Sequence, residues 1–137
     1  MRSTYLIFWK LFIIITIIGV ILGGDILVKK HLSNTTSEFV SKLEELKEKT
    51  VEGKESDDRK EAKDTIKKVE NKWKEISKIW STVIVHQEVD NIEQAIIRAK
   101  SYINDGKLED AIPEIETAIF FAEHINQREQ FKLKNIF

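Results

Sequence analysis

The sequence predicts an all-α protein, in which an N-terminal transmembrane helix precedes a helical bundle of about four antiparallel helices paired as αα-hairpins. Three observations lead to this prediction. An uncharged apolar run fills residues 11–24. Apolar residues in the remainder of the chain recur at spacings of three and four, which is the period of an amphipathic helix. The 137 residues include five Gly and one Pro, too few turn formers for a β-sandwich with many turns.

The composition of the chain argues against several classes of function. Lys and Arg number 22 against 23 Asp and Glu, a net charge of −1 that is unlike the basic charge of nucleic-acid-binding proteins. The absence of Cys removes disulfides, Cys-ligated zinc and thiol catalysis. We therefore expect no nucleic-acid partner and no cofactor.

The charge is distributed unevenly along the chain. All charged residues except Arg2, Lys10 and Asp25 lie beyond residue 28. This distribution predicts a membrane anchor of the signal-anchor type at residues 1–28 and a charged α-helical bundle domain at residues 29–137.

The apolar run at residues 11–24 is predicted to belong to a membrane-spanning helix. As a helix, this run is about 21 Å long, whereas the hydrocarbon core of a bilayer is about 30 Å thick. The segment reaches a spanning length if it extends back to Tyr5, with the Lys10 amine reaching the interface, or forward to Val28. We therefore expect residues 5–28 to contact the lipid bilayer.

Two alternatives stay open for this segment: a cleaved signal peptide, which would give a secreted helical protein, and a buried helix of a soluble protein. Gly23 and Gly24 follow the apolar run without the small-residue pattern of a cleavage site, which favours a retained anchor. Basic residues flank the segment on both sides, so the positive-inside rule is nearly tied. The layout of an export signal predicts a single-pass protein of the cell membrane with an extracytoplasmic C-terminal domain.

The bundle domain is predicted to begin after a break at residues 34–36, with Ser37 as the N-cap of its first helix. The apolar stripe of this helix consists of Phe39, Leu43 and Leu46. Residues 52–58 are polar and predict a turn, after which Asp57 or Asp58 caps a second helix.

The second helix is predicted to run to about residue 85 and has the clearest periodicity in the chain. Its successive a and d positions hold Ala62, Ile66, Val69, Trp73, Ile76, Trp80 and Val83. Core packing explains Trp73 and Trp80 more simply than an aromatic ligand platform, because both fall within an aliphatic stripe. The same stripe leaves self-association open, since heptads also pair helices of separate chains.

A third helix is predicted to start at Asp90, which forms a capping-box pattern with Glu93, unless one helix bends there. Residues 104–106 predict its end, because Gly tolerates the left-handed conformation that closes a helix. A fourth helix follows, with Pro113 in or near its first turn. The stripes of these two helices consist of Val89, Ile92, Ile96, Ala99 and Ile103, and of Leu108, Ala111, Ile112, Ile115, Ala118, Ile119, Ala122 and Ile125. The tail residues expected to pack back on the bundle are Phe131, Leu133, Ile136 and Phe137.

No nucleophile–base arrangement and no Gly-rich loop is recognisable, so we expect the protein not to be an enzyme. The candidate functional cluster consists of Trp80, His86, Gln87, Glu88, Asp90 and His124. His86 and Asp90 would share one face of a continuous helix, and His124 would approach His86 if the second and fourth helices are neighbours. A capping cluster at a helix junction is the simpler interpretation, because the ligands fall short of the four of a zinc site. Phe120 and Phe121 point in different directions on a helix, so one is expected to be buried and the other to contact a partner or the membrane surface.

The segment WSTVIVHQEVDN at residues 80–91 resembles a family of small single-pass membrane proteins of Firmicute bacteria, the domain of unknown function 4363. The other stretches that carry the resemblance are Ile92, residues 99–102, residues 121–125, Asn135 and Ile136. The resemblance implies a single-pass, mostly helical protein. It carries no established activity and transfers no catalytic residue, but it makes His86, Gln87 and Glu88 the first residues to test.

The leading functional hypothesis is a membrane-anchored, non-enzymatic interaction or scaffold module. A tether and amphipathic helices without a recognisable active site favour it, and a protein partner or self-association is expected. The alternative is an extracytoplasmic ligand or metal sensor with His86, Glu88 and His124 at its site.

Overall fold

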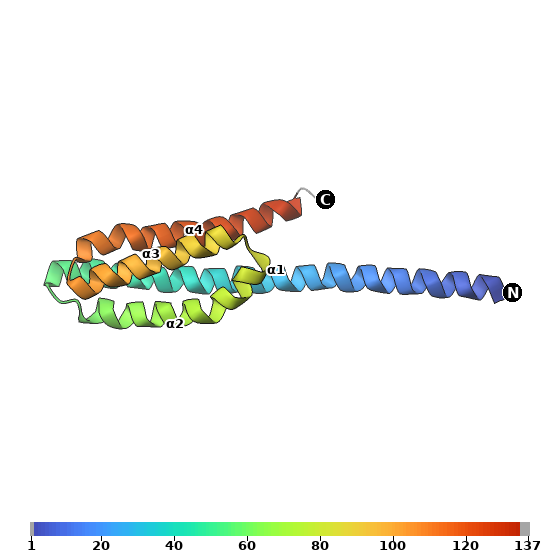
Figure 1. The fold of residues 1–137 in the computed structure, drawn as a ribbon, viewed down its shortest axis with the longest axis horizontal. Coiled ribbons are helices and arrows are strands. Elements are labelled where there is room, and N and C mark those ends of the chain that lie inside the picture. The colour runs from blue at the N-terminus through green and yellow to red at the C-terminus, as the bar shows by residue number, and fades with distance from the viewer. Residues whose placement is uncertain (1, 135–137) are drawn as a thin grey trace. The chain divides into compact units, whose positions relative to one another are not determined.

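The computed structural model describes the backbone of residues 2–134 and the side chains of residues 5–28, 30–82, 84–125, 127 and 128. The described residues form four helices and no strand (Figure 1), which confirms the all-α class. The helices are α1 (Arg2–Ser56), α2 (Lys60–Val83), α3 (His86–Asp105) and α4 (Leu108–Lys134). The chain divides into two compact units, Met1–Leu32 and Ser33–Phe137.

Residues 5–28 of the first unit expose their large apolar side chains around the whole helix. All 18 large apolar residues between Tyr5 and Val28 are exposed, by 41% to 77% of their surface. The polar Thr16 in this run donates its hydroxyl hydrogen bond to the Phe12 carbonyl at 2.8 Å, so its polarity is satisfied inside the helix. Among the described residues, α1 is the one helix that is long and apolar enough to cross a membrane, by length and composition.

The predicted break at residues 34–36 is wrong, because these residues are helical within α1. Ser37 is correspondingly not an N-cap, and its hydroxyl donates to the Ser33 carbonyl one turn earlier at 3.1 Å. Ser and Thr can satisfy their hydroxyls within a helix in this way, so a short polar stretch does not by itself end one.

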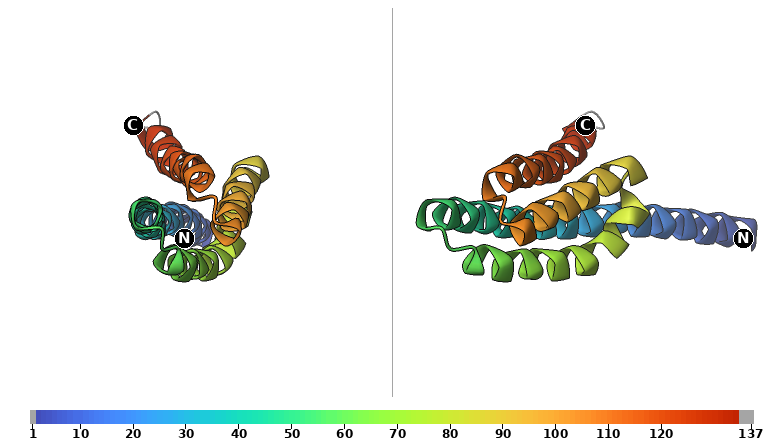
Figure 2. Two further views of the ribbon diagram at one scale, coloured as in Figure 1. Left: turned by 90° about the vertical axis from the view of Figure 1, so that its left-hand side faces the viewer. Right: turned by 60° about the vertical axis from the view of Figure 1, so that its left-hand side comes forward.

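The four helices of the second unit surround one core, as Figure 2 shows in the view along the bundle. Ion pairs join each helix to its neighbours in the ring, and two pairs between α1 and α2 and two between α3 and α4 follow antiparallel order. The predicted apolar stripes are confirmed as buried in the described part, where Ile112 alone among their residues is only half-buried. The side chain of Val83 and the tail residues Phe131, Leu133, Ile136 and Phe137 lie outside the described side chains.

The turns that join the helices differ from the prediction in position. α1 continues to Ser56, so Gly53, expected in a turn, is helical and buried. The Gly53 carbonyl accepts a hydrogen bond from the Asp58 backbone N–H at 3.0 Å, and a Cβ on Gly53 would lie only 2.6 Å from the Asp58 carbonyl oxygen. The N-cap of α2 is Arg59, so the prediction of Asp57 or Asp58 as the cap is wrong. Asp58 precedes the cap, and its carboxylate accepts from the Lys60 N–H at 2.9 Å.

The third helix begins at His86 and not at Asp90, so the capping-box prediction is wrong. Ile84 and Val85 are extended, with φ/ψ of −113°/155° and −60°/126°, and they separate α2 from α3. Both are β-branched and lose little by leaving the helical conformation. Asp90 is therefore an exposed residue inside α3.

The turn between α3 and α4 confirms the predicted stop. α3 ends at Asp105, and Gly106 is left-handed with a φ of 77°. The Arg59 guanidinium donates to the Asn104 carbonyl at 2.9 Å, so the α1–α2 turn is tied to the end of α3. Pro113 lies in the second turn of α4, slightly beyond the predicted position.

Candidate functional site

Five of the six candidate residues flank the short connection between α2 and α3, and the sixth is on α4. Trp80 is buried in the last turn of α2, with 1% of its surface exposed. His86, Gln87 and Glu88 form the first turn of α3, and Asp90 follows in its second turn. His86, Gln87 and Asp90 are exposed, whereas Glu88 is half-buried. The candidate residues therefore do not share one environment: Trp80 belongs to the core, whereas most of the others lie on the exposed surface at the start of α3.

Trp80 belongs to an aromatic core cluster with Trp73 and Phe39. The two indole rings meet edge to face, with centroids 5.8 Å apart and an angle of 90°. Phe39 lies 5.4 Å from Trp73 and 6.0 Å from Trp80 between ring centroids. Edge-to-face contacts place the positive edge of one ring against the negative face of another, which stabilises the pair. The core-packing interpretation of both tryptophans agrees with this geometry.

The indole N–H groups of Trp73 and Trp80 are buried and have no hydrogen-bond partner among the described residues. An unsatisfied buried donor of this kind costs about 1–3 kcal/mol. The free energy gained from packing three large rings therefore has to exceed this loss.

Glu88 forms an ion pair with Arg128 of α4, in which the guanidinium Nη1 donates to the carboxylate Oε1. The pair joins the start of α3 to the described end of α4. Its charge-assisted hydrogen bond holds the Glu88 carboxylate in a cross-helix contact. Arg128 was not a candidate from the sequence, because its partner is 40 residues away and no local pattern connects them.

His124 lies on α4 and stacks on Phe120, with ring centroids 6.0 Å apart and an angle of 13°. Phe120 also meets Phe121 edge to face at 5.5 Å. Phe120 is 62% exposed, as expected for one residue of the phenylalanine pair, but Phe121 is half-buried and not buried as predicted. We call Phe120, Phe121 and His124 the α4 aromatic patch.

A metal-ligating arrangement is not seen in the described residues. No three His, Asp or Glu side chains gather there closely enough to hold a metal ion. His124 has an aromatic neighbour, and Glu88 has an arginine. The local chemistry of the cluster is therefore that of helix packing and ion pairing.

Three lysines that the sequence did not single out have raised pKa values. Hydrogen bonding to Glu38, helped by the charges of Glu38 and Glu75, raises the pKa of Lys72. Its amine is 3.0 Å from Glu38, and its side chain is only 12% exposed. Lys47 and Lys49 likewise have raised pKa values, chiefly because of hydrogen bonds to Glu116 and to Glu52. These groups stabilise neighbouring helices and form no reactive pair.

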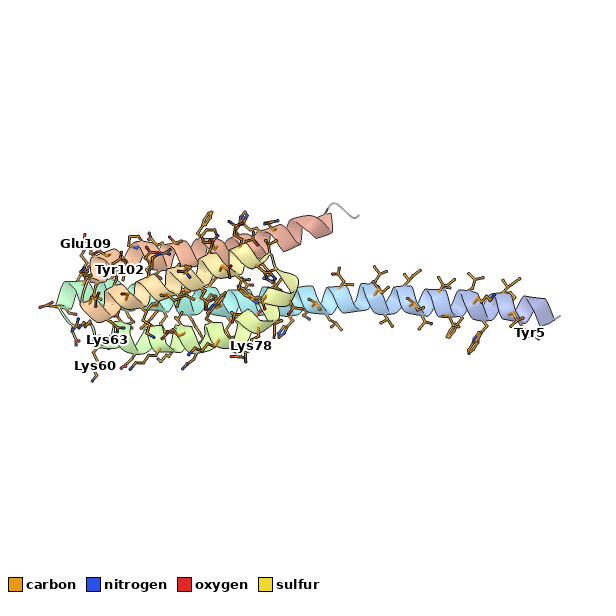
Figure 3. The ribbon with its side chains drawn as sticks, in the orientation of Figure 1. Tyr5, Lys60, Lys63, Lys78, Tyr102 and Glu109 are labelled. Atoms are coloured by element: carbon orange, nitrogen blue, oxygen red, sulfur yellow. The ribbon has the colours of Figure 1, made fainter. Side chains whose placement is uncertain are left out.

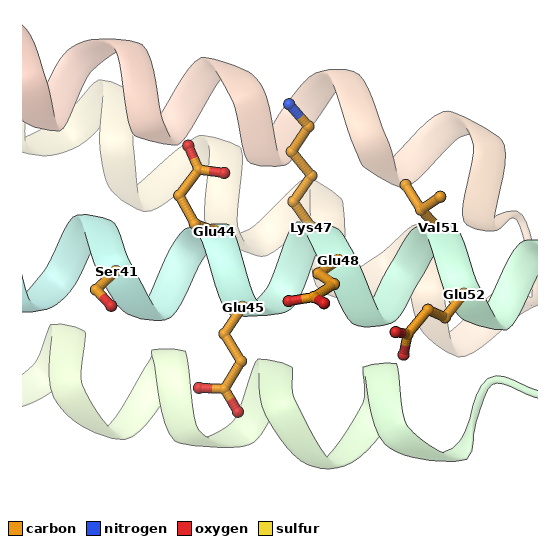
Figure 4. A pocket seen from close by; sticks show the side chains of 7 residues that line it. All are labelled: Ser41, Glu44, Glu45, Lys47, Glu48, Val51 and Glu52. Atoms are coloured by element: carbon orange, nitrogen blue, oxygen red, sulfur yellow. The ribbon is translucent and has the colours of Figure 1, made fainter.

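An open groove of about 580 Å³ lies along the outer face of α1 (Figure 4). Its lining consists of Ser41, Glu44, Glu45, Lys47, Glu48, Val51 and Glu52. Lys47 is engaged with Glu116 of α4 at 2.8 Å, so the remaining charges of the lining are carboxylates. None of the candidates from the sequence lies in this groove.

The comparisons with known proteins identify the family. Neither the curated proteins nor the solved structures gave a match. The family model described as Domain of unknown function (DUF4363) matches residues 26–136. This range contains α1 from residue 26 onward and the whole of α2, α3 and α4. The resemblance found in residues 80–91 is confirmed by this match. The chain belongs to the family described as Domain of unknown function (DUF4363).

Proposed function

We propose that the protein is a single-pass membrane protein whose helical bundle is a non-enzymatic interaction or scaffold module. The observation that supports the proposal most is the exposure of all 18 large apolar side chains between Tyr5 and Val28. An exposed apolar surface of this extent is unfavourable in water and favourable in lipid. A helix satisfies its own backbone hydrogen bonds and therefore tolerates the bilayer interior.

The bundle supports the interaction part of the proposal through its surface. Its core is filled by its own helices, and its outer faces are mainly charged. The α4 aromatic patch differs from this pattern because Phe120 is 62% exposed. Aromatic residues are enriched where proteins bind one another, since they contribute a large contact area with few rotatable bonds. The patch is therefore the proposed contact surface for a protein partner.

The membrane part of the proposal is tested by fractionation and topology. Full-length protein should float with membrane vesicles in a density gradient and resist extraction by alkaline carbonate. A reporter fused after residue 137 and active on one side of the bilayer should be active on the extracytoplasmic side. Full-length protein that remains in the soluble fraction would contradict the anchor, and a reporter active only in the cytoplasm would contradict the orientation.

The interaction part is tested by crosslinking in intact membranes. A photoreactive phenylalanine at position 120 should give one adduct of defined mass, and Phe120→Ser should prevent recovery of the same complex. Ile97 is the matched control, because it is 51% exposed and lies on α3 outside the patch. Equal adduct yields at positions 97 and 120, or no adduct at either, would argue against the α4 aromatic patch as a binding surface.

A further inference from the structure

The end of the bundle that carries Ser33 also carries the α2–α3 connection. Lys72 of α2 pairs with Glu38, and the Trp80 ring lies 6.0 Å from the Phe39 ring. The part of α2 beyond Trp80 therefore lies at the end of the bundle where α1 residues 33–38 are found. Figure 1 shows the α2–α3 connection at the end of the bundle opposite the α1–α2 turn.

Chain connectivity limits how far this end can be from a membrane. Ser33 follows Val28, the last residue of the predicted span, by five positions. Five residues extend at most about 18 Å, and about 7.5 Å as a helix. Any orientation of the bundle therefore keeps its Ser33 end near the lipid headgroups if residues 5–28 span the bilayer.

Two of the four exposed large apolar side chains described in the bundle lie at this end. Among the described residues beyond 32, the large apolar side chains that are exposed belong to Ile79, Val85, Ile97 and Phe120. Ile79 is 48% exposed in the last turns of α2, and Val85 is 56% exposed in the connection to α3. The opposite turns, at residues 57–59 and 106–107, are polar.

Basic and polar residues adjoin Ile79 and Val85 in the sequence. Lys78 precedes Ile79 and is exposed, and Figure 3 shows it on α2 near the α2–α3 connection. His86 and Gln87 follow Val85 and are exposed as well. Apolar side chains beside a lysine are typical of segments that lie in the membrane interface, where the amine reaches phosphate groups. Ile84, which precedes Val85, is only 9% exposed and belongs to the core of the bundle.

We propose that Lys78, Ile79, Val85 and His86, which we call the α2–α3 corner, contact the phospholipid headgroup interface beside the span. Ile79 and Val85 enter the interface, and Lys78 pairs with lipid phosphates. The corner gives the bundle a second attachment to the membrane and fixes which of its faces points toward other proteins. The inference rests on the proposed membrane anchor and deepens it.

The test uses the full-length chain, which contains no Cys and therefore accepts a single labelled Cys. Gln87→Cys carries a fluorescent dye at the corner, and Lys107→Cys carries the same dye at the opposite end of the bundle. Both proteins are reconstituted into phosphatidylcholine and phosphatidylglycerol vesicles that include a lipid with a nitroxide near the headgroup. We expect several-fold quenching at position 87 and little at position 107.

A variant pair separates lipid contact from a mere change of fold. Ile79→Asn combined with Val85→Asn should reduce the quenching at position 87, whereas the equally exposed Ile97→Asn should leave it unchanged. Circular dichroism of each variant checks that the helical content is retained. The span alone keeps this end of the bundle near the headgroups, so unchanged quenching at position 87 in a double variant that retains its helical content overturns the corner.

The outcomes distinguish the corner from the anchor. A dye at position 87 that stays unquenched in protein that floats with the vesicles overturns the corner and leaves the anchor intact. Equal quenching at positions 87 and 107 also overturns it, because the contact would then have no preferred end. Protein that does not float with the vesicles overturns both proposals.

Discussion

The two hairpins of the bundle have the same heptad spacing but different side-chain sizes. Large rings fill the contact between α1 and α2, where Phe39 meets Trp73 and Trp80. Alanines are frequent on the buried faces of α3 and α4, which hold Ala95, Ala99, Ala111, Ala118 and Ala122. The backbones of α3 and α4 accordingly approach each other more closely than those of α2 and α3. Apolar periodicity thus sets which face is buried, and residue size sets how near the helices come.

The hairpins also differ in the cations that join their helices. Lys72 and Lys49 of the first hairpin contact Glu38 and Glu61 at 3.0 and 3.1 Å. In the second hairpin, arginines form the ion pairs between the helices. The Arg98 guanidinium lies 2.8 Å from the Glu114 carboxylate, and Arg128 pairs with Glu88. An arginine stays charged at any pH that proteins tolerate, whereas a lysine loses its proton in alkali. The two hairpins should therefore respond differently to large-to-small changes, to added volume and to pH.

The largest expected effect comes from removing a ring of the first hairpin. Trp80→Ala should lower the free energy of unfolding by about 3–5 kcal/mol, because the side chain is fully buried and its cavity cannot collapse completely. Denaturant titration of the protein in detergent, followed by circular dichroism, measures the change. Trp80→Phe is the control and should lose less, since it retains an aromatic ring and removes an unsatisfied N–H. Equal losses for the two variants would contradict the core role of the ring.

Added volume should damage the second hairpin next most strongly. Ala118→Leu is expected to destabilise the bundle by about 1–3 kcal/mol, because α3 and α4 have no room for three extra carbon atoms. Gln94→Leu adds an apolar side chain at an exposed position of α3 and should be nearly neutral. The same denaturant titration compares them. An unchanged midpoint for Ala118→Leu would show that the two helices can separate without loss.

The turn of the second hairpin should be sensitive to a Cβ atom. Gly106→Ala is expected to cost roughly 1–2 kcal/mol, because an L-residue is strained in the left-handed conformation. The φ of Gly106 is 77°, and its added Cβ would lie 2.7 Å from Arg59 Nη1. Thermal unfolding measures the loss, with Lys107→Ala at the adjacent exposed position as the control. A loss no greater than that of the control would rule out a special requirement for glycine there.

The smallest expected effect is a pH dependence of stability that the lysine pair of the first hairpin has and the arginine pairs of the second hairpin lack. Hydrogen bonding to Glu38 raises the folded-state pKa of Lys72 above its ordinary value of 10.5. The stabilisation is therefore complete below pH 10.5 and is lost as the pH rises through the raised value. We expect the denaturation midpoint to fall above about pH 10, the ordinary lysine range.

Lys72→Arg provides the matched control for this pH dependence. It should retain the pair with Glu38 and flatten the alkaline fall, since arginine stays protonated. Lys78→Arg, at an exposed position with no part in this pair, should leave the fall unchanged. Identical alkaline profiles for the wild type and Lys72→Arg would exclude Lys72 as a source of the dependence.

Much of the fold was predictable because a helix shows its buried face in local spacing. The stripe from Ala62 to Trp80 and the stop at Gly106 both follow from residues within a few turns of one another. Helix boundaries were less predictable where polar residues had local partners. The hydroxyl of Ser37 bonds within α1, and α3 starts after the extended Val85, one turn before Asp90.

The candidate site was predictable only in part. His86, Gln87 and Glu88 stood out from the resemblance, but the partner of Glu88 did not, because Arg128 lies on another helix. His124 stacks on Phe120, which precedes it by four residues, so the two residues are one helical turn apart and their contact could be predicted from the sequence. The sequence did not distinguish this contact from an approach of His124 to His86.

By itself, the sequence determined the helical class, the apolar N-terminal segment and the identity of the core residues, because each depends on composition or on the helical period within one segment. Only the tertiary structure decided that Arg59 reaches Asn104, that the largely buried Lys72 pairs with Glu38, and that Ile79 and Val85 remain uncovered. These contacts depend on which helices become neighbours and on how closely side-chain volume lets them approach. Neither quantity is encoded in the spacing of a single helix.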